Sequence, residues 1–340
     1  MAQGEPRIGG SAFDFIFENR IDQDQDYNGS VWRAVSIIDG NAYAIKVLDF
    51  TRDRFEYLTA LKTFDHPNIV KIHDVWHQFH RIYVQMELCL RSLNHVVSYN
   101  FVNRILSSPQ QIFKIMSDVS AGLQVLHNCG IYNVDLCNKH LLIAPDGTVK
   151  ICGFGVSSTH HTPSPIIFDF KTVTPEIMNN SPIFPLVYNP ATDVYDLGLA
   201  LYELYTCQQF LSCDKTWYRL RHDKIDFAYP QAFKPLALLL KRMLTSKPEA
   251  RISIAEIMQS EYYEKGEPNP VLLSVIPNLP ALNVMIYTRH SLAHALPHTR
   301  HYTPEPSIIP DPLPRPNNNN NNNNDNNNNR RSARRTINFN

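Results

Sequence analysis

The sequence predicts an α+β protein in which the strands come first along the chain and the helices follow. Two strand-like stretches, residues 31–38 and 43–48, flank Asp39-Gly40-Asn41, which is a hairpin signal. A third strand-like stretch covers Ile82–Leu88. Later apolar residues recur at helical spacing, and Val194–Tyr205 is apolar nearly all round, as a buried helix is. This order predicts a small sheet-rich part and a larger helical part.

Composition divides the chain into three parts. Residues 1–12 are expected to be flexible, and residues 13–263 show no low-complexity break. From Asn317 to Asn329 the sequence is asparagine interrupted only by Asp325. Such a tract cannot bury enough apolar surface to fold. We therefore expect one folded domain at 13–263 and a disordered Pro/Asn-rich tail at 264–340.

Charge and cysteine usage argue against several classes of function. The 32 basic and 32 acidic residues give a formal net charge of zero, which argues against nucleic-acid binding over the whole surface. The six cysteines form no C-x-x-C pair, which favours a reduced compartment over a disulfide framework. We find no signal-peptide pattern and no apolar run long enough for a bilayer. We therefore expect an intracellular protein, cytoplasmic or nuclear, with no membrane partner.

Several short motifs, in order and at matching spacing, resemble those of the eukaryotic protein kinases. Tyr43–Lys46 resembles the strand-three V-A-I-K motif, whose lysine grips the α- and β-phosphates. Gln85–Cys89 resembles the hinge that faces an adenine, and Asp193–Gly198 resembles the buried helix-F motif. Thr174–Glu176 resembles A-P-E, and Arg251 stands where the family has the arginine that pairs with that glutamate.

The resemblance implies a bilobal protein-kinase fold over residues 13–263. A small antiparallel-sheet lobe with one helix is expected at about 13–90, and a larger, mainly helical lobe at about 91–263. The hinge motif, followed by Ser92-Leu93, looks closest to the Wee-type cell-cycle inhibitory kinases. The initiation-factor kinases share a similar hinge.

A degenerate nucleotide site is the first functional implication of this resemblance. Its candidate residues are Val31, Lys46, Glu87 and Cys89. The family's Gly-rich loop should precede Val31, yet only Gly29 matches it. Three carboxylates occupy this loop instead: Asp22, Asp24 and Asp26. Since each close contact with a polyanion would cost on the order of 1 kcal/mol or more, we expect weak ATP binding.

The metal-holding positions of the family are both changed. Phosphoryl transfer needs divalent metal and a carboxylate that orients the acceptor hydroxyl. Asp135 matches the position of that carboxylate, as a vestigial or a working base. His140 replaces the metal-binding asparagine, Gly153 replaces the D-F-G aspartate, and Cys137 replaces a phosphate-facing lysine. Imidazole is a poor ligand for magnesium and glycine offers none, so we predict no metal site.

Helix C leaves two alternatives open. Counting back from His66 puts Tyr57 where the family has the glutamate that pairs with Lys46. A shift of one residue would instead place Glu56 there and restore the pair.

Two main hypotheses follow for function. The first is an inactive serine/threonine-type kinase, a pseudokinase, that acts as a binding, scaffold or allosteric regulatory protein. Its expected partner is a protein, and the Wee-type resemblance implies an active kinase or another cell-cycle protein. The alternative is a weakly active or metal-independent kinase that transfers phosphate from ATP to a protein hydroxyl. ATP without magnesium is the one cofactor left open, and a third hypothesis assigns the main role to the tail.

Overall fold

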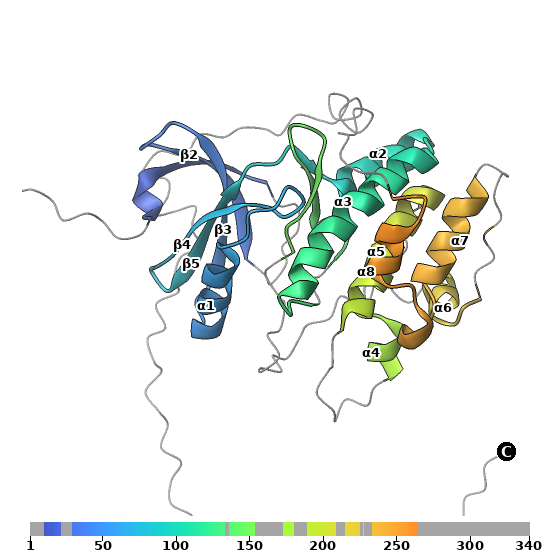
Figure 1. Cartoon of the computed structure of the whole chain (residues 1–340). Coiled ribbons are helices and arrows are strands. Elements are labelled where there is room, and N and C mark those ends of the chain that lie inside the picture. The colour runs from blue at the N-terminus through green and yellow to red at the C-terminus, as the bar shows by residue number, and fades with distance from the viewer. Residues whose placement is uncertain are drawn as a thin grey trace, which may run out of the picture. The chain divides into compact units, whose positions relative to one another are not determined.

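The computed structural model describes residues 10–21, 29–132, 136–153, 173–179, 189–208, 215–224, 227 and 233–263. Three features named above lie outside these residues: the carboxylates at 22–26, Asp135 and the Asn-rich tail. Contacts divide the chain into units at 1–296 and 297–340, and every described residue belongs to the first. Within that unit the α+β, two-lobed fold is confirmed (Figure 1).

The small lobe is a five-stranded antiparallel sheet in the order β1-β2-β3-β5-β4, with one α-helix. The strands are β1 (Phe15–Arg20), β2 (Ser30–Ser36), β3 (Ala42–Asp49), β4 (Ile72–Gln78) and β5 (Arg81–Glu87), preceded by the short helix η1 (Ala12–Asp14). Helix α1 (Arg52–Leu61) begins after Thr51, whose side chain accepts a hydrogen bond from the Arg54 amide. The expected hairpin joins β2 to β3, and Gly40 has φ of 73° in its turn.

The two faces of this sheet have different cores, because alternate residues of a strand face opposite sides. On one face, aromatic rings of β1, β2, β4 and β5 form a separate cluster. Trp76 stacks between Phe15 and Tyr83, with centroid distances of 5.7 and 5.4 Å. On the other face, Ala44 and Met86 belong to the main core, which continues into the large lobe. This second face therefore looks toward the space between the lobes.

The large lobe is mainly helical, as expected. Its helices are α2 (Leu93–Asn103), α3 (Pro109–Asn128), α4 (Pro175–Asn179), α5 (Pro190–Thr206), α6 (Lys215–Arg221), α7 (Lys234–Met243), η3 (Pro248–Ala250) and α8 (Ile254–Gln259). A small sheet joins β6 (Arg91–Ser92), β7 (Leu141–Ile143) and β8 (Val149–Ile151). Helix α3 lies between the small lobe and most of the other helices (Figure 1) and contacts α5, α8 and β8.

A hydrogen-bonded joint connects the lobes at the segment after α1. The Asn68 carbonyl accepts from the Ile151 amide at 2.9 Å, and the Val70 amide donates to the Ile151 carbonyl at 2.9 Å. The Asn68 side chain also donates to the Val149 carbonyl at 3.1 Å. A Cβ at Gly122 of α3 would lie 2.8 Å from the Asn68 carbonyl oxygen, so a side chain there would push α3 away from this joint.

A buried ion pair on α3 supports β8 from behind. Asp118 accepts from Lys114 Nζ at 2.6 Å with one oxygen and from the Val149 amide at 3.0 Å with the other. Both side chains are nearly fully buried. Because each charge has a partner and the second oxygen caps a strand, the desolvation cost of this pair is offset.

Arg251 and Glu176 form the predicted buried pair of the large lobe. Two hydrogen bonds of 2.9 Å join the guanidinium to both carboxylate oxygens. The Arg251 side chain is fully buried, lies 4.8 Å from the Tyr195 ring centroid, and also donates to the Ala191 carbonyl. Burial alone would raise the pKa of Glu176, but the hydrogen bonds and charge of Arg251 outweigh it and lower this pKa.

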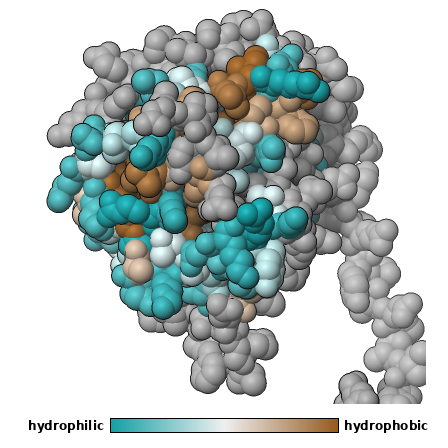
Figure 2. All heavy atoms as spheres, turned by 90° about the vertical axis from the view of Figure 1, so that its right-hand side faces the viewer, coloured by the Kyte–Doolittle hydropathy of each residue, from teal (hydrophilic) through white to brown (hydrophobic). Residues whose placement is uncertain are grey.

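The surface of the large lobe exposes large apolar side chains. Several lie on α2 and the loop that follows it: Phe101, Val102, Ile105 and Leu106. On the face shown in Figure 2, apolar residues appear as brown groups among hydrophilic ones.

The buried pair yields a stability prediction. Arg251→Met should lower the free energy of unfolding by about 3–5 kcal/mol, because it leaves the Glu176 carboxylate buried without its partner. Urea unfolding followed by circular dichroism measures this loss. Arg242→Met is the matched control, since Arg242 and Glu256 form an exposed pair 3.0 Å apart that is worth at most about 1 kcal/mol.

The same variants have an expected pH dependence. The Glu176 pKa is lowered in the folded state, so its stabilising effect is fully present above the ordinary value of 4.5 and is lost as the pH falls through the folded-state pKa. The difference between wild type and Arg251→Met should therefore shrink below about pH 4.5. An equal loss for both arginine variants, or a pH-independent difference, would contradict the structural role of this pair.

Candidate functional site

Lys46 and Val31 lie directly opposite each other on neighbouring strands. Lys46 on β3 is in register with Val31 on β2 and with Val84 on β5. Cross-strand partners share a face of the sheet, and Val84 belongs to the main core. Lys46 therefore lies on the face that looks toward the large lobe, and its side chain is half-buried. This position favours a role in the cleft over that of a solvated surface lysine.

The hinge residue Glu87 uses its side chain to join the two lobes. Its Oε1 accepts from the Lys71 amide at 2.7 Å and from Lys150 Nζ on β8 at 2.8 Å. Both side chains of the Lys150–Glu87 pair are largely buried. The sequence predicted a role for the Glu87 backbone but did not indicate Lys150. Strand alternation in Val149–Ile151 was the available signal, since it sets Lys150 apart from its apolar neighbours.

Cys89 and Met86 complete the hinge region. Met86 is buried in the main core, and Cys89 is half-buried against the same core. Burial, followed by the nearby Glu87 carboxylate, raises the pKa of the Cys89 thiol to about 12. The Cys89 thiol therefore stays protonated and unreactive near neutral pH.

Helix α1 places Tyr57, rather than Glu56, on its inner side. The Glu56 side chain is 62% exposed and accepts from Arg52 on the same helix at 2.8 Å. Tyr57 is half-buried and packs against the main core. The one-residue shift that would pair Glu56 with Lys46 is therefore wrong, and a tyrosine takes the inward position.

Gly29 is required by packing where β2 begins. It has φ of 97°, and a Cβ there would lie 2.1 Å from the Val47 carbonyl oxygen and 2.8 Å from Leu48 Cδ2. No side chain fits without moving the backbone of β3. The glycine that matches the family's loop thus has a structural reason to be there, independent of any phosphate.

The loop that precedes β7 pairs a thiol with an imidazole. His140 Nδ1 lies 3.4 Å from Cys137 Sγ, and the His140 amide donates to the Cys137 carbonyl at 2.9 Å. The residue after β8 is bound to the same loop, because the Cys152 amide donates to the His140 carbonyl at 3.0 Å. Gly153 is buried beside it.

These residues do not fit a magnesium ion. Magnesium prefers oxygen ligands, whereas Gly153 has no side chain and His140 offers an imidazole that contacts a thiol. Among the described residues no three His, Cys, Asp or Glu side chains are grouped closely enough to hold any metal. Asp135, the candidate base, falls outside these residues, so its role stays a prediction.

Comparison with known proteins decides the family. A sequence model described as "Protein kinase domain" matches residues 27–263. The chain belongs to the protein kinase family. A probable protein kinase of Dictyostelium discoideum is 29% identical over 248 residues, which cover 67% of each chain.

Two further kinase relatives are longer than this chain. The membrane-associated tyrosine- and threonine-specific cdc2-inhibitory kinase of Drosophila melanogaster is 25% identical, over 73% of this chain and 47% of its own. The interferon-induced, double-stranded RNA-activated protein kinase of Mus musculus is 25% identical, over 68% and 48%. The chain thus spans about half the length of these two relatives. The cdc2-inhibitory name agrees with the Wee-type resemblance of the hinge.

The motifs that support the kinase fold keep their buried side-chain pairs in this domain. Asp193 of the helix-F motif is fully buried and lies 2.9 Å from His127 Nε2, and Glu176 and Arg251 pair as described. Lys46 and Val31 are cross-strand partners on the sheet face that contributes to the main core, Cys89 packs against that core, and Glu87 pairs with Lys150. Among the described helices, none is long and apolar enough to span a bilayer.

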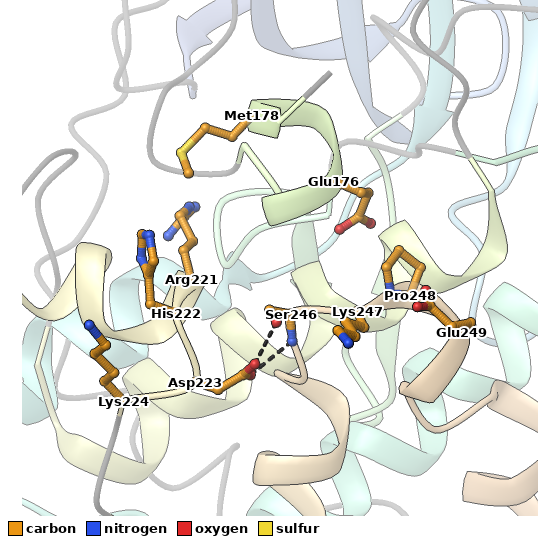
Figure 3. Close-up of a pocket in the computed structure, with 10 residues that line it drawn as sticks. All are labelled: Glu176, Met178, Arg221, His222, Asp223, Lys224, Ser246, Lys247, Pro248 and Glu249. Atoms are coloured by element: carbon orange, nitrogen blue, oxygen red, sulfur yellow. Dashed lines mark hydrogen bonds between the residues drawn. The ribbon is translucent and has the colours of Figure 1, made fainter. Parts of the chain in front are cut away.

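A pocket of about 510 Å³ lies in the large lobe below α4 (Figure 3). It is lined by α4, by the end of α6 with the residues that follow, and by residues 246–249. Two of its carboxylates serve the fold: Glu176 binds Arg251, and Asp223 accepts from the Ser246 amide and hydroxyl. Lys224 and Lys247 on the rim are exposed. The exposed lining is of mixed charge, because Asp223 and Glu249 are exposed as well.

Gly29 yields a prediction that separates packing from backbone strain. Gly29→Ala should destabilise the protein by more than the roughly 1–3 kcal/mol of a strained backbone alone, because its methyl group would overlap the Val47 carbonyl. Gly40→Ala is the matched control, since Gly40 also has positive φ but no atom within 4 Å of the added Cβ. Urea unfolding of both variants gives the comparison, and equal losses would refute the packing role.

Proposed function

We propose that this kinase-family chain is a pseudokinase that works by binding another protein, as a scaffold or an allosteric regulator. The observation that carries the proposal is the change of the two metal-holding positions, Gly153 and His140. Both positions that would hold magnesium are changed, and the imidazole at one of them contacts Cys137 at 3.4 Å. Phosphoryl transfer depends on metal ions to neutralise the developing charge, and among the described residues these two positions offer no oxygen ligand for magnesium.

The retained frame supports a binding role. The interlobe joint, the Glu87–Lys150 pair and the Arg251–Glu176 pair hold the kinase shape without any catalytic group. The large lobe adds the α4 pocket with its exposed lysines and the exposed apolar side chains at the end of α2. Such surfaces are suited to a protein partner.

The class of partner rests on the comparisons. The fly relative is named for inhibition of cdc2, and a Caenorhabditis briggsae relative carries a similar name. We therefore propose an active kinase or another cell-cycle protein as the partner.

We also propose that the protein works inside the cell. The five described cysteines are all free thiols, which agrees with a reducing compartment.

A second candidate is a weakly active or metal-independent kinase. Lys46 favours it, because this lysine lies on the cleft-facing side of β3 and is half-buried. Under this hypothesis Lys46 would hold phosphate and Asp135 would orient the acceptor hydroxyl. A cleft that binds no nucleotide would remove this candidate.

A thermal-shift titration of the full chain with ATP tests both candidates. A ligand at about 100 times its Kd adds about 2.7 kcal/mol to stability, so binding would be readily visible. We expect no shift that depends on magnesium or manganese. No shift at all would remove the second candidate and direct the search to protein partners, whereas a metal-independent shift would be compatible with both a structural nucleotide and a metal-independent kinase.

The control for this titration is the double variant Gly153→Asp/His140→Asn. It returns an oxygen-bearing side chain to each changed position, so a magnesium-dependent shift is expected in the variant alone. A shift in the wild type that needs metal would overturn the proposal, because another side chain would then replace Gly153.

A further inference from the structure

The Cys137–His140 pair has the geometry of an activated nucleophile. His140 Nδ1 lies 3.4 Å from Cys137 Sγ, within hydrogen-bonding distance for sulfur. With the imidazole proton on Nε2, Nδ1 accepts the thiol proton. A nucleophile and a base within hydrogen-bond reach are the signature of covalent chemistry.

The loop that carries this pair is held in place on several sides. The His140 amide donates to the Cys137 carbonyl at 2.9 Å, which closes the turn between the two residues. Between them, the buried Asn138 side chain donates to the Ala200 carbonyl at 3.1 Å and to Glu203 Oε2 at 2.9 Å. The thiol and the imidazole are therefore positioned by the backbone, not by a chance contact of mobile side chains.

Three other cysteines, Cys89, Cys129 and Cys207, lack this combination. Cys89 is held protonated by burial, as shown above. Burial also raises the pKa of the buried Cys207 thiol, which donates to the Ile105 carbonyl. Cys129 is exposed, but within the described part of the chain no side-chain base is bonded to its sulfur. Cys137 is half-buried, so it is not enclosed in the core as Cys207 is.

We propose that Cys137 is a site of covalent modification by small α,β-unsaturated carbonyl compounds, with His140 as the base. The thiol proton moves to His140 Nδ1 as the sulfur bonds to the β-carbon. The π electrons of the carbon–carbon double bond shift to the α-carbon, which then takes the proton back from the imidazolium. Atoms and charge balance without a further reactant. This reaction needs neither ATP nor a protein partner, so it is independent of the proposed function.

Solvent exposure of the thiol and activation of the thiol by a base predict different cysteines as the faster to react. The proposal can therefore be tested in the wild-type chain. Access alone would favour the exposed Cys129, whereas activation by His140 favours Cys137. The full chain is treated with a substoichiometric amount of N-ethylmaleimide, and the modified cysteines are quantified by peptide mass spectrometry. Cys137 should react roughly tenfold faster than Cys129. Faster reaction of Cys129 would overturn the proposal.

His140→Asn tests the role of the base. In this variant the Cys137 rate should fall to that of Cys129 or below, while the Cys129 rate in the same chain stays unchanged. An unchanged Cys137 rate in a variant that melts like the wild type would contradict the role of His140. If the variant does not fold, the wild-type competition alone decides.

Discussion

The hydrogen-bonded joint between residues 68–70 and β8 is the constraint on which the arrangement of the two lobes depends. It uses backbone groups of Asn68, Val70 and Ile151, so it is insensitive to the chemistry of the cleft. Gly122 lets α3 approach the joint, and Asp118 fixes β8 from the other side. The Glu87–Lys150 pair adds a side-chain link between the same two lobes. Neither Gly153 nor His140 takes part in these contacts.

The residues that support the fold are therefore separate from the two changed metal-holding positions. Residues that support the frame pair with one another in buried positions, as Arg251 does with Glu176 and Asp193 with His127. Their replacement would leave buried charges unpaired. Gly153 and His140 take part in no buried ion pair of this kind. The contact between His140 and Cys137 is local to one loop. Selection for a stable binding surface alone would preserve the first group and release the second.

The sequence predicted the frame well and the local chemistry only in part. The Asp39-Gly40 signal led to the β2–β3 hairpin, because a hairpin depends on a short-range pattern. The Glu176–Arg251 pair joins residues 75 positions apart and was expected only from the resemblance to the kinase family. Helix phase was ambiguous, and the structure turns Tyr57 inward in place of Glu56. The Lys150–Glu87 pair joins residues 63 positions apart, a contact that no local pattern encodes. The Cys137–His140 contact depends on a turn whose geometry follows from its tertiary anchors.

We propose that this domain does not perform metal-assisted phosphoryl transfer. The most direct measurement is incorporation of phosphate from ATP and magnesium into the full chain and a general protein acceptor, comparing wild type with Asp135→Asn by intact mass. We expect no incorporation above background in either protein. Incorporation by the wild type that disappears in Asp135→Asn would show a working base at Asp135 and contradict this proposal.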